Sequence, residues 1–168
     1  GVSIELQTFE DFDTVTNNFI SGACDIITTD GSALVGRKAK QQPEGENWVI
    51  FPATPISKEP LGPTYGQNDS AFSDAVNWAV YATMIADEKG VNSGNVDEML
   101  ASGDTETIRL LGGEGELQTG MGLPADAFYQ VIKQVGNYDE IYSRNLNPVG
   151  LSREGSANAA WTAGGLVY

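Results

Sequence analysis

An α/β fold is predicted for the first third of this chain, on three observations. Apolar and polar residues alternate over 2–6, which predicts a half-buried strand. Two short runs, the β-branched 26–29 and the apolar 48–51, are bounded by turn residues, as in strands buried on both faces. Residues 12–20 and 33–38 show helical spacing between these runs. Strand, helix, strand, helix, strand is typical of a parallel sheet covered by helices.

The composition excludes some classes of partner. The 168 residues correspond to one domain by length, and no apolar run reaches the ~20 residues of a membrane span. Twenty-three acidic residues against nine basic ones give a formal charge of −14. A nucleic-acid-binding protein needs a basic face, so no nucleic-acid partner is expected.

The sequence lacks several residues and motifs that are common in enzyme active sites and metal sites. There is no histidine, and the single cysteine, Cys24, can form neither an internal disulfide nor a cysteine zinc cluster. Neither a phosphate-binding loop motif nor a nucleophile-elbow motif is present. We therefore expect no enzymatic activity, no cofactor and no metal.

One acidic residue stands where an α/β sheet binds ligands. Asp30 follows the run 26–29 and precedes the second helical segment, so it lies at the carboxyl end of a predicted strand. Ligands of open α/β sheets bind at such strand ends. Aspartate is also a favoured N-cap, so the residues alone leave two hypotheses open, a helix cap and a ligand-binding carboxylate.

The chain changes character after the third predicted strand. Four prolines between positions 52 and 63 indicate an extended connector, either between two lobes or as a surface loop. Helical patterns fill the rest and are interpreted as core-forming stripes. A capping box is predicted from Asn95 to Glu98 and a last short helix over 157–161. These helices have no sheet of their own to cover, so they pack on each other or another half of a larger protein is missing.

Four blocks of sequence resemble the general L-amino-acid solute-binding proteins of bacterial ABC importers. They are the motif of Ser21 to Asp30 and the segments 56–63, 132–138 and 158–168. The resemblance implies a type II periplasmic-binding-protein fold, of which this chain is the incomplete C-terminal half. It implies part of a three-layer α/β ligand-binding lobe over 1–54, a hinge strand over 55–68, and a helical region over 69–168 that returns to the other lobe.

The resemblance also implies a role for the acidic residue. In related proteins an acid at the matching strand end receives the α-ammonium group of the ligand, which assigns this role to Asp30, with Thr29 and Ser32 as neighbouring hydroxyls. The arginine that grips the ligand's α-carboxylate would lie in the N-terminal half. The expected location is the periplasm. The expected partners are an L-amino acid, a membrane permease, and either the missing half or a second copy of the chain.

Two other functions stay open at this point. A truncated chain without ligand would act as an interaction or assembly module, because its unsatisfied helices favour association. The less favoured alternative is an enzyme on a related two-lobe scaffold that uses carboxylates such as Asp30 and Glu59.

Overall fold

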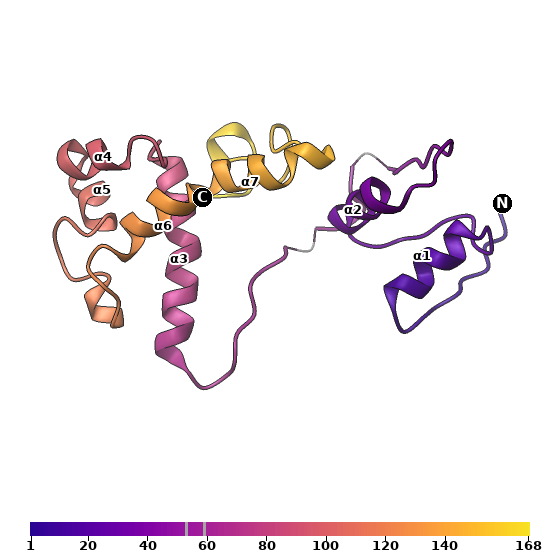
Figure 1. Cartoon of the computed structure of the whole chain (residues 1–168), viewed down its shortest axis with the longest axis horizontal. Coiled ribbons are helices and arrows are strands. Elements are labelled where there is room, and N and C mark those ends of the chain that lie inside the picture. Colours follow the sequence, from indigo (N-terminus) through magenta and orange to yellow (C-terminus); the bar gives the residue numbers. More distant parts are fainter. Residues whose placement is uncertain (53, 59) are drawn as a thin grey trace. The chain divides into compact units, whose positions relative to one another are not determined.

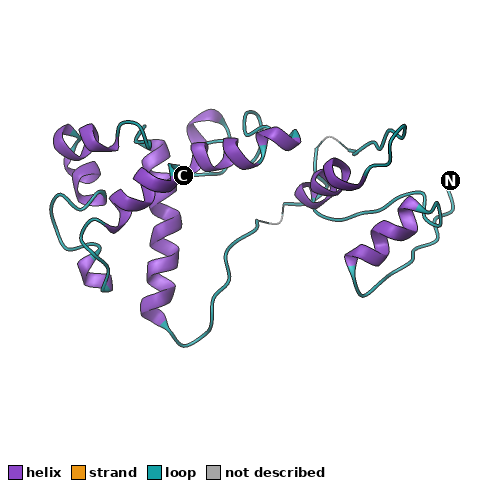
Figure 2. Cartoon of the chain, in the orientation of Figure 1, coloured by secondary structure: helices purple, strands orange, loops and turns teal. Residues whose placement is uncertain are grey.

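The computed structural model describes residues 1–52, 54–58 and 60–168. The chain divides into two compact units, Gly1–Glu59 and Pro60–Tyr168. In the described part of both units the regular secondary structure is helical, and it holds a single isolated bridge, between Ala160 and Val167, in place of a sheet (Figures 1 and 2). The proposed hinge role of 55–68 stays a prediction.

Unit 1 contains the two helices that the spacing predicts, α1 (Phe12–Ile20) and α2 (Gly31–Gln41). Helix α1 begins at Asp11, whose carboxylate accepts hydrogen bonds from the backbone N–H and the hydroxyl of Thr14 at 2.8 and 2.6 Å. It ends where Gly22 takes a φ of +75°, a conformation that favours glycine. Local signals therefore suffice to define these helices.

The three predicted strands of unit 1 are not formed, so the α/β prediction was wrong for the sheet. Residues 2–6, 26–29 and 48–51 have no strand assignment. Their apolar side chains are exposed, by 91% at Val2 and 67% at Ile26. A strand needs a neighbour to accept its backbone hydrogen bonds, and no described segment pairs with these runs. The apolar pattern of these three runs is that of buried strands, but the described residues of unit 1 supply no neighbouring strand to bury them.

Side-chain contacts hold unit 1 together around a small interior. Arg37 of α2 forms an ion pair with Asp13 of α1 at 2.5 Å and stacks over the ring of Phe12 at 5.0 Å. Trp48 meets the ring of Phe19 edge-on at 5.0 Å. Thr16 is the one fully buried residue among those described in this unit. A unit with so little buried apolar surface gains little hydrophobic stabilisation.

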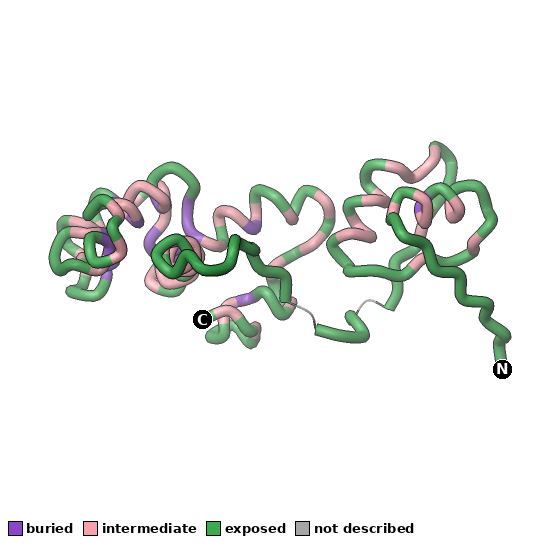
Figure 3. The backbone as a smooth tube through the Cα atoms, turned by 90° about the horizontal axis from the view of Figure 1, so that it is seen from below, coloured by how far each residue is buried: buried purple, intermediate pink, exposed green. Residues whose placement is uncertain are grey.

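Unit 2 is a helical cluster with a true core. Its elements are α3 (Ser70–Glu88), α4 (Val96–Ser102), α5 (Thr105–Leu110), the 3-10 helix η1 (Thr119–Met121), α6 (Ala127–Val135), α7 (Tyr138–Asn145), η2 (Asn147–Val149) and η3 (Trp161–Ala163). Figure 3 shows the buried positions concentrated in this unit. The core side chains are Ala82, Ala86, Val91, Val96, Leu110, Leu111, Phe128 and Ile132. The interpretation of the apolar stripes as core is confirmed for these positions.

One close approach in this core requires glycine. Gly112 follows α5 with a φ of +83°, and a Cβ atom there would lie 1.8 Å from the carbonyl oxygen of Ala125. The turn can therefore pack directly against the segment that leads into α6. Any larger residue would have to move backbone.

Two local predictions in unit 2 were wrong. Asn95 precedes α4, but its side chain makes no cap bond and accepts from the backbone N–H of Asn92 at 2.7 Å. The predicted helix over 157–161 is not formed: a turn leads to the isolated bridge at Ala160, and the 3-10 helix η3 begins at Trp161. The capping box of this unit lies instead between Asn137 and Glu140, at the start of α7.

Glu140 also ties α7 to a distant loop. Its carboxylate accepts from the hydroxyl and backbone N–H of Ser93, at 2.5 and 3.0 Å, and from the backbone N–H of Asn137 at 2.9 Å. Burial acts to raise the pKa of this carboxyl, but the hydrogen bonds from Ser93 and Asn137 outweigh it, so the pKa lies below the ordinary value of 4.5.

The lowered pKa makes the stability of unit 2 depend on pH. Ionised Glu140 stabilises the fold fully above its unfolded-state pKa, and this contribution is lost as the pH falls below about 4.5 and through the folded-state pKa. We expect Glu140→Gln to be less stable than the parent at pH 7, with a difference that shrinks below pH 4. Urea unfolding across this range measures it, with the exposed Glu116→Gln as control. An equal difference at both pH values would contradict the prediction.

Candidate ligand-binding site

Asp30 lies at the start of α2, at the place that the sequence predicts. It is the N-cap residue, with φ −56° and ψ 141°, and its carbonyl oxygen accepts from the backbone N–H of Leu34 at 3.0 Å. The side chain makes no cap hydrogen bond and is exposed. The backbone of Asp30 thus begins the helix while its carboxylate stays open to solvent.

Other aspartates in the same chain show what a capping carboxylate does. Asp11, Asp69 and Asp104 accept hydrogen bonds from backbone N–H groups in the first turns of α1, α3 and α5, at 2.8, 3.0 and 2.9 Å. Hydrogen bonds from Thr14 lower the pKa of Asp11, and the backbone N–H of Thr107 lowers that of Asp104. The side chain of Asp30 makes no such hydrogen bond, so it does not act as a helix cap.

The other two predicted site residues lie beside Asp30 in the chain. Thr29 ends the extended segment before α2, and Ser32 is the second residue of the helix. Both are exposed. The three oxygen-bearing side chains therefore gather at the N-terminal end of α2. Glu59, the second carboxylate of the enzyme alternative, lies outside the described residues.

Two of the cations of α2 are engaged in contacts within unit 1. Arg37 binds Asp13 and also donates to the amide oxygen of Gln41 at 3.3 Å. The ammonium group of Lys38 donates to the carbonyl oxygen of Trp48. These side chains anchor the C-terminal half of α2, the half away from Asp30, to the rest of the unit.

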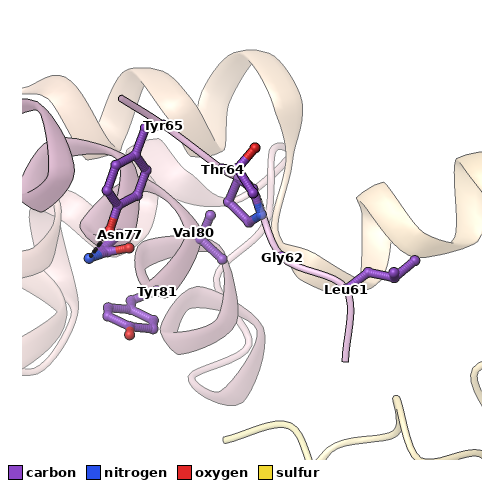
Figure 4. A pocket seen from close by; sticks show the side chains of 8 residues that line it. Leu61, Gly62, Thr64, Tyr65, Asn77, Val80 and Tyr81 are labelled. Carbon is purple, nitrogen blue, oxygen red and sulfur yellow. Dashed lines mark hydrogen bonds between the residues drawn. The ribbon is translucent and has the colours of Figure 1, made fainter. Parts of the chain in front are cut away.

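Unit 2 contains a shallow groove that the sequence did not reveal. It has a volume of about 490 Å³ and lies between the extended segment 61–65 and α3 (Figure 4). The amide of Asn77 donates to the hydroxyl of Tyr65 at 3.4 Å across it. We call it the α3 groove; its lining residues are Leu61, Gly62, Pro63, Thr64, Tyr65, Asn77, Val80 and Tyr81. It contains neither acidic nor basic side chains. Only tertiary structure brings the two segments together.

A titratable cluster elsewhere in unit 2 joins two helices. The Asp97 carboxylate of α4 accepts from the hydroxyl of Tyr129 at 2.6 Å and from the ammonium of Lys133 at 2.7 Å, both on α6. The hydrogen bond from Lys133 lowers the pKa of Asp97, and the bond to Asp97 raises that of Tyr129. At neutral pH the carboxyl of Asp97 is therefore ionised, and Tyr129 and Lys133 keep their protons. The cluster thus has a structural role, linking α4 to α6.

Comparison with known proteins identifies the class. No model of a protein family matches the chain. The chain is 39% identical over 165 residues to the general L-amino acid-binding periplasmic protein AapJ of Rhizobium johnstonii, and the match covers 95% of this chain and 47% of that protein. It is 41% identical over 154 residues to the glutamate/glutamine/aspartate/asparagine-binding protein BztA of Rhodobacter capsulatus, covering 89% and 44%.

A solved structure gives the same result. A periplasmic binding protein of an ABC transporter from Brucella ovis, with glutathione bound, superposes with a TM-score of 0.83 and 40% identity, over 95% of this chain and 50% of that one. The chain is therefore a fragment of the periplasmic-binding-protein fold. More particularly, it is a homologue of the binding proteins of amino-acid ABC transporters, and it spans about half the length of the relatives it matches.

These relatives confirm part of what the sequence predicts. They are non-enzymatic solute-binding proteins, as expected. None of the helices in the described part of the chain is long and apolar enough to cross a membrane. The roles of Asp30, Thr29 and Ser32 stay predictions.

Proposed function

We propose that this chain forms one wall of an L-amino-acid site in the periplasmic binding component of an ABC transporter, with Asp30 as the acceptor of the ligand's α-ammonium group. One observation carries the proposal. The Asp30 carboxylate is exposed at a helix start and makes no cap bond, in a chain 39% identical along 95% of its length to an L-amino acid-binding protein.

The chemistry of the ligand fits this residue. A free amino acid carries an ammonium group that loses its water when it enters a cleft, and a carboxylate acceptor offsets that loss through charge-assisted hydrogen bonds. Asp30 lies at the N-terminal end of α2, where the helix backbone carries partial positive charge. The hydroxyls of Thr29 and Ser32 offer uncharged acceptors beside it.

The ligand's carboxylate needs a second wall. Arg37 and Lys38 are engaged within unit 1, and the resemblance to the solute-binding proteins assigns the carboxylate-binding arginine to the half of the fold that this chain does not span. Ligand contact with both walls favours a closed form, which the transporter's permease recognises in the periplasm. The chain by itself is expected to bind amino acids weakly.

The experiment joins the chain to the half of AapJ that it does not match and titrates this two-lobe protein with L-amino acids in a calorimeter. We expect one ligand per molecule, with at least one amino acid bound in the micromolar range or tighter. The isolated chain is the control. A folded two-lobe protein that binds none of the common L-amino acids would refute the proposal.

A further inference from the structure

The last part of the chain is fastened to the C-terminal end of α3 by two polar contacts. The guanidinium group of Arg153 pairs with Asp87 at 2.6 Å and with Asp139 at 2.8 Å, and its side chain is only 12% exposed. The indole N–H of Trp161 donates to the carboxylate of Glu88 at 3.1 Å. These contacts hold the C-terminal segment in a defined place beside the helix.

The backbone of this segment forms a tight loop that brings two aromatic residues together. A parallel bridge joins Ala160 to Val167, and the backbone N–H of Trp161 donates to the carbonyl oxygen of Val167 at 2.8 Å. A Cβ atom at Gly165 would lie 1.8 Å from a backbone carbonyl oxygen across the loop, so only glycine allows this approach. The residues that follow the two bridge members, Trp161 and Tyr168, therefore lie next to each other.

These two rings and one carboxylate line a shallow pocket of about 370 Å³. We call it the C-terminal pocket; its lining residues are Glu88, Trp161 and Tyr168. Trp161 is 54% exposed and Tyr168 is 83% exposed. The hydrogen bond from Trp161 to Glu88 lies in the plane of the indole ring, so the faces of the ring are left to other contacts. The pocket thus combines aromatic surface with a negative charge.

The charge of Glu88 is not neutralised within the described part of the chain. Its hydrogen bond comes from the uncharged indole of Trp161. The adjacent cation, Lys89, pairs instead with Glu106 at 2.8 Å and Asp104 at 3.5 Å. Glu88 is also the last residue of α3, and the C-terminal end of a helix carries partial negative charge. The pocket therefore favours a cation.

We propose that the C-terminal pocket binds a quaternary ammonium ion, with the rings of Trp161 and Tyr168 against its methyl groups and Glu88 balancing its charge. The faces of tryptophan and tyrosine rings attract cations, and quaternary ammonium groups are typical ligands of such rings. In an open pocket a primary ammonium ion keeps its strongly bound water and gains little. A quaternary ammonium ion has no N–H groups to hydrate, so contact with the rings decides its binding. The site shares no residue with the proposed amino-acid site around Asp30 and is tested independently of it.

The test follows the indole N–H signal of Trp161 by nuclear magnetic resonance while choline chloride is added to the 168-residue chain. The signal is identified by its loss in Trp161→Phe. We expect a shift that saturates with a Kd of about 1–10 mM, because the pocket is shallow and open. Sodium chloride at the same ionic strength is the control and should produce no saturating shift.

Two relatives of choline test the chemical class without changing the protein. Ethanolamine has the same skeleton with N–H groups in place of the methyl groups, so it lacks the ring contacts. Glycine betaine keeps the methyl groups but carries a carboxylate, which Glu88 repels. We expect both to bind at least about fivefold more weakly than choline.

Matched variants test the residues. Glu88→Gln keeps an acceptor for the indole N–H and removes the charge, and Tyr168→Leu removes one ring; each should weaken choline binding at least about threefold. Glu98→Gln and Tyr81→Leu change exposed residues outside the pocket and should leave the affinity unchanged. Circular dichroism verifies that each variant is folded.

Three results would overturn the proposal. The first is no shift of the Trp161 signal at about 100 mM choline, where a site with a Kd of about 10 mM would be nine-tenths occupied. The second is ethanolamine binding as tightly as choline, which would mean that the rings contribute nothing. The third is an equal effect of the pocket variants and their controls, which would place the bound choline elsewhere.

Discussion

Asp30→Ala is expected to reduce amino-acid affinity roughly a hundredfold or more in the two-lobe protein that contains this chain. Removing one partner of a desolvated charge pair leaves the other uncompensated, which is the costliest single loss in such a site. Asp30→Asn keeps the size of the side chain and removes its charge, so it should lose nearly as much. Calorimetric titration of each variant measures the change.

The neighbouring residues provide graded comparisons. Thr29→Val and Ser32→Ala remove uncharged hydrogen-bonding groups, each with an expected loss of roughly two- to tenfold. Asp25→Ala removes another exposed carboxylate from the same segment and should change affinity little. Undiminished affinity in both Asp30 variants would show that the ammonium group is held elsewhere.

Phe128→Ala is expected to have the largest effect on the stability of unit 2. The ring is 1% exposed and belongs to the core cluster that also contains Leu111 and Ile132. Deleting it removes apolar burial and leaves a cavity, at a cost of about 3–5 kcal/mol in the free energy of unfolding. Domains of this size have about 5–15 kcal/mol in total, so the variant should be near the limit of folding.

Urea unfolding followed by circular dichroism measures this difference. Val135→Ala is the matched control, because Val135 lies on the same helix, α6, and is 45% exposed. Its expected cost is below about 1 kcal/mol. A loss at Phe128 no larger than at Val135 would mean that the cluster around Phe128 is not the core of this unit.

The sequence predicted the helices well because their signals are local. The segment 12–20 shows its apolar spacing, its cap at Asp11 and its stop at Gly22 within a dozen residues. The capping box was placed wrongly at Asn95 because the pattern alone cannot tell which carboxylate has a second partner. Glu140 forms the true box and is also bound by Ser93, 47 residues away.

The strands show the limit of such prediction. The alternation in 2–6 records the two faces of a strand, but a ladder exists only where a neighbouring segment completes it. The α3 groove was missed for a related reason, since 61–65 and α3 form it only together. Asp30 could be found from the sequence because it lies at one recognisable position, between the β-branched run 26–29 and the helix that follows it. Its role followed from resemblance.

The most direct test of the account is a crystal structure of the two-lobe protein with an L-amino acid bound. We predict that the ligand's α-ammonium nitrogen lies within hydrogen-bond distance of the Asp30 carboxylate, with α2 beginning at the same residue as in the isolated chain. A bound amino acid whose ammonium group contacts other acceptors, while Asp30 faces solvent, would contradict the assignment of this site.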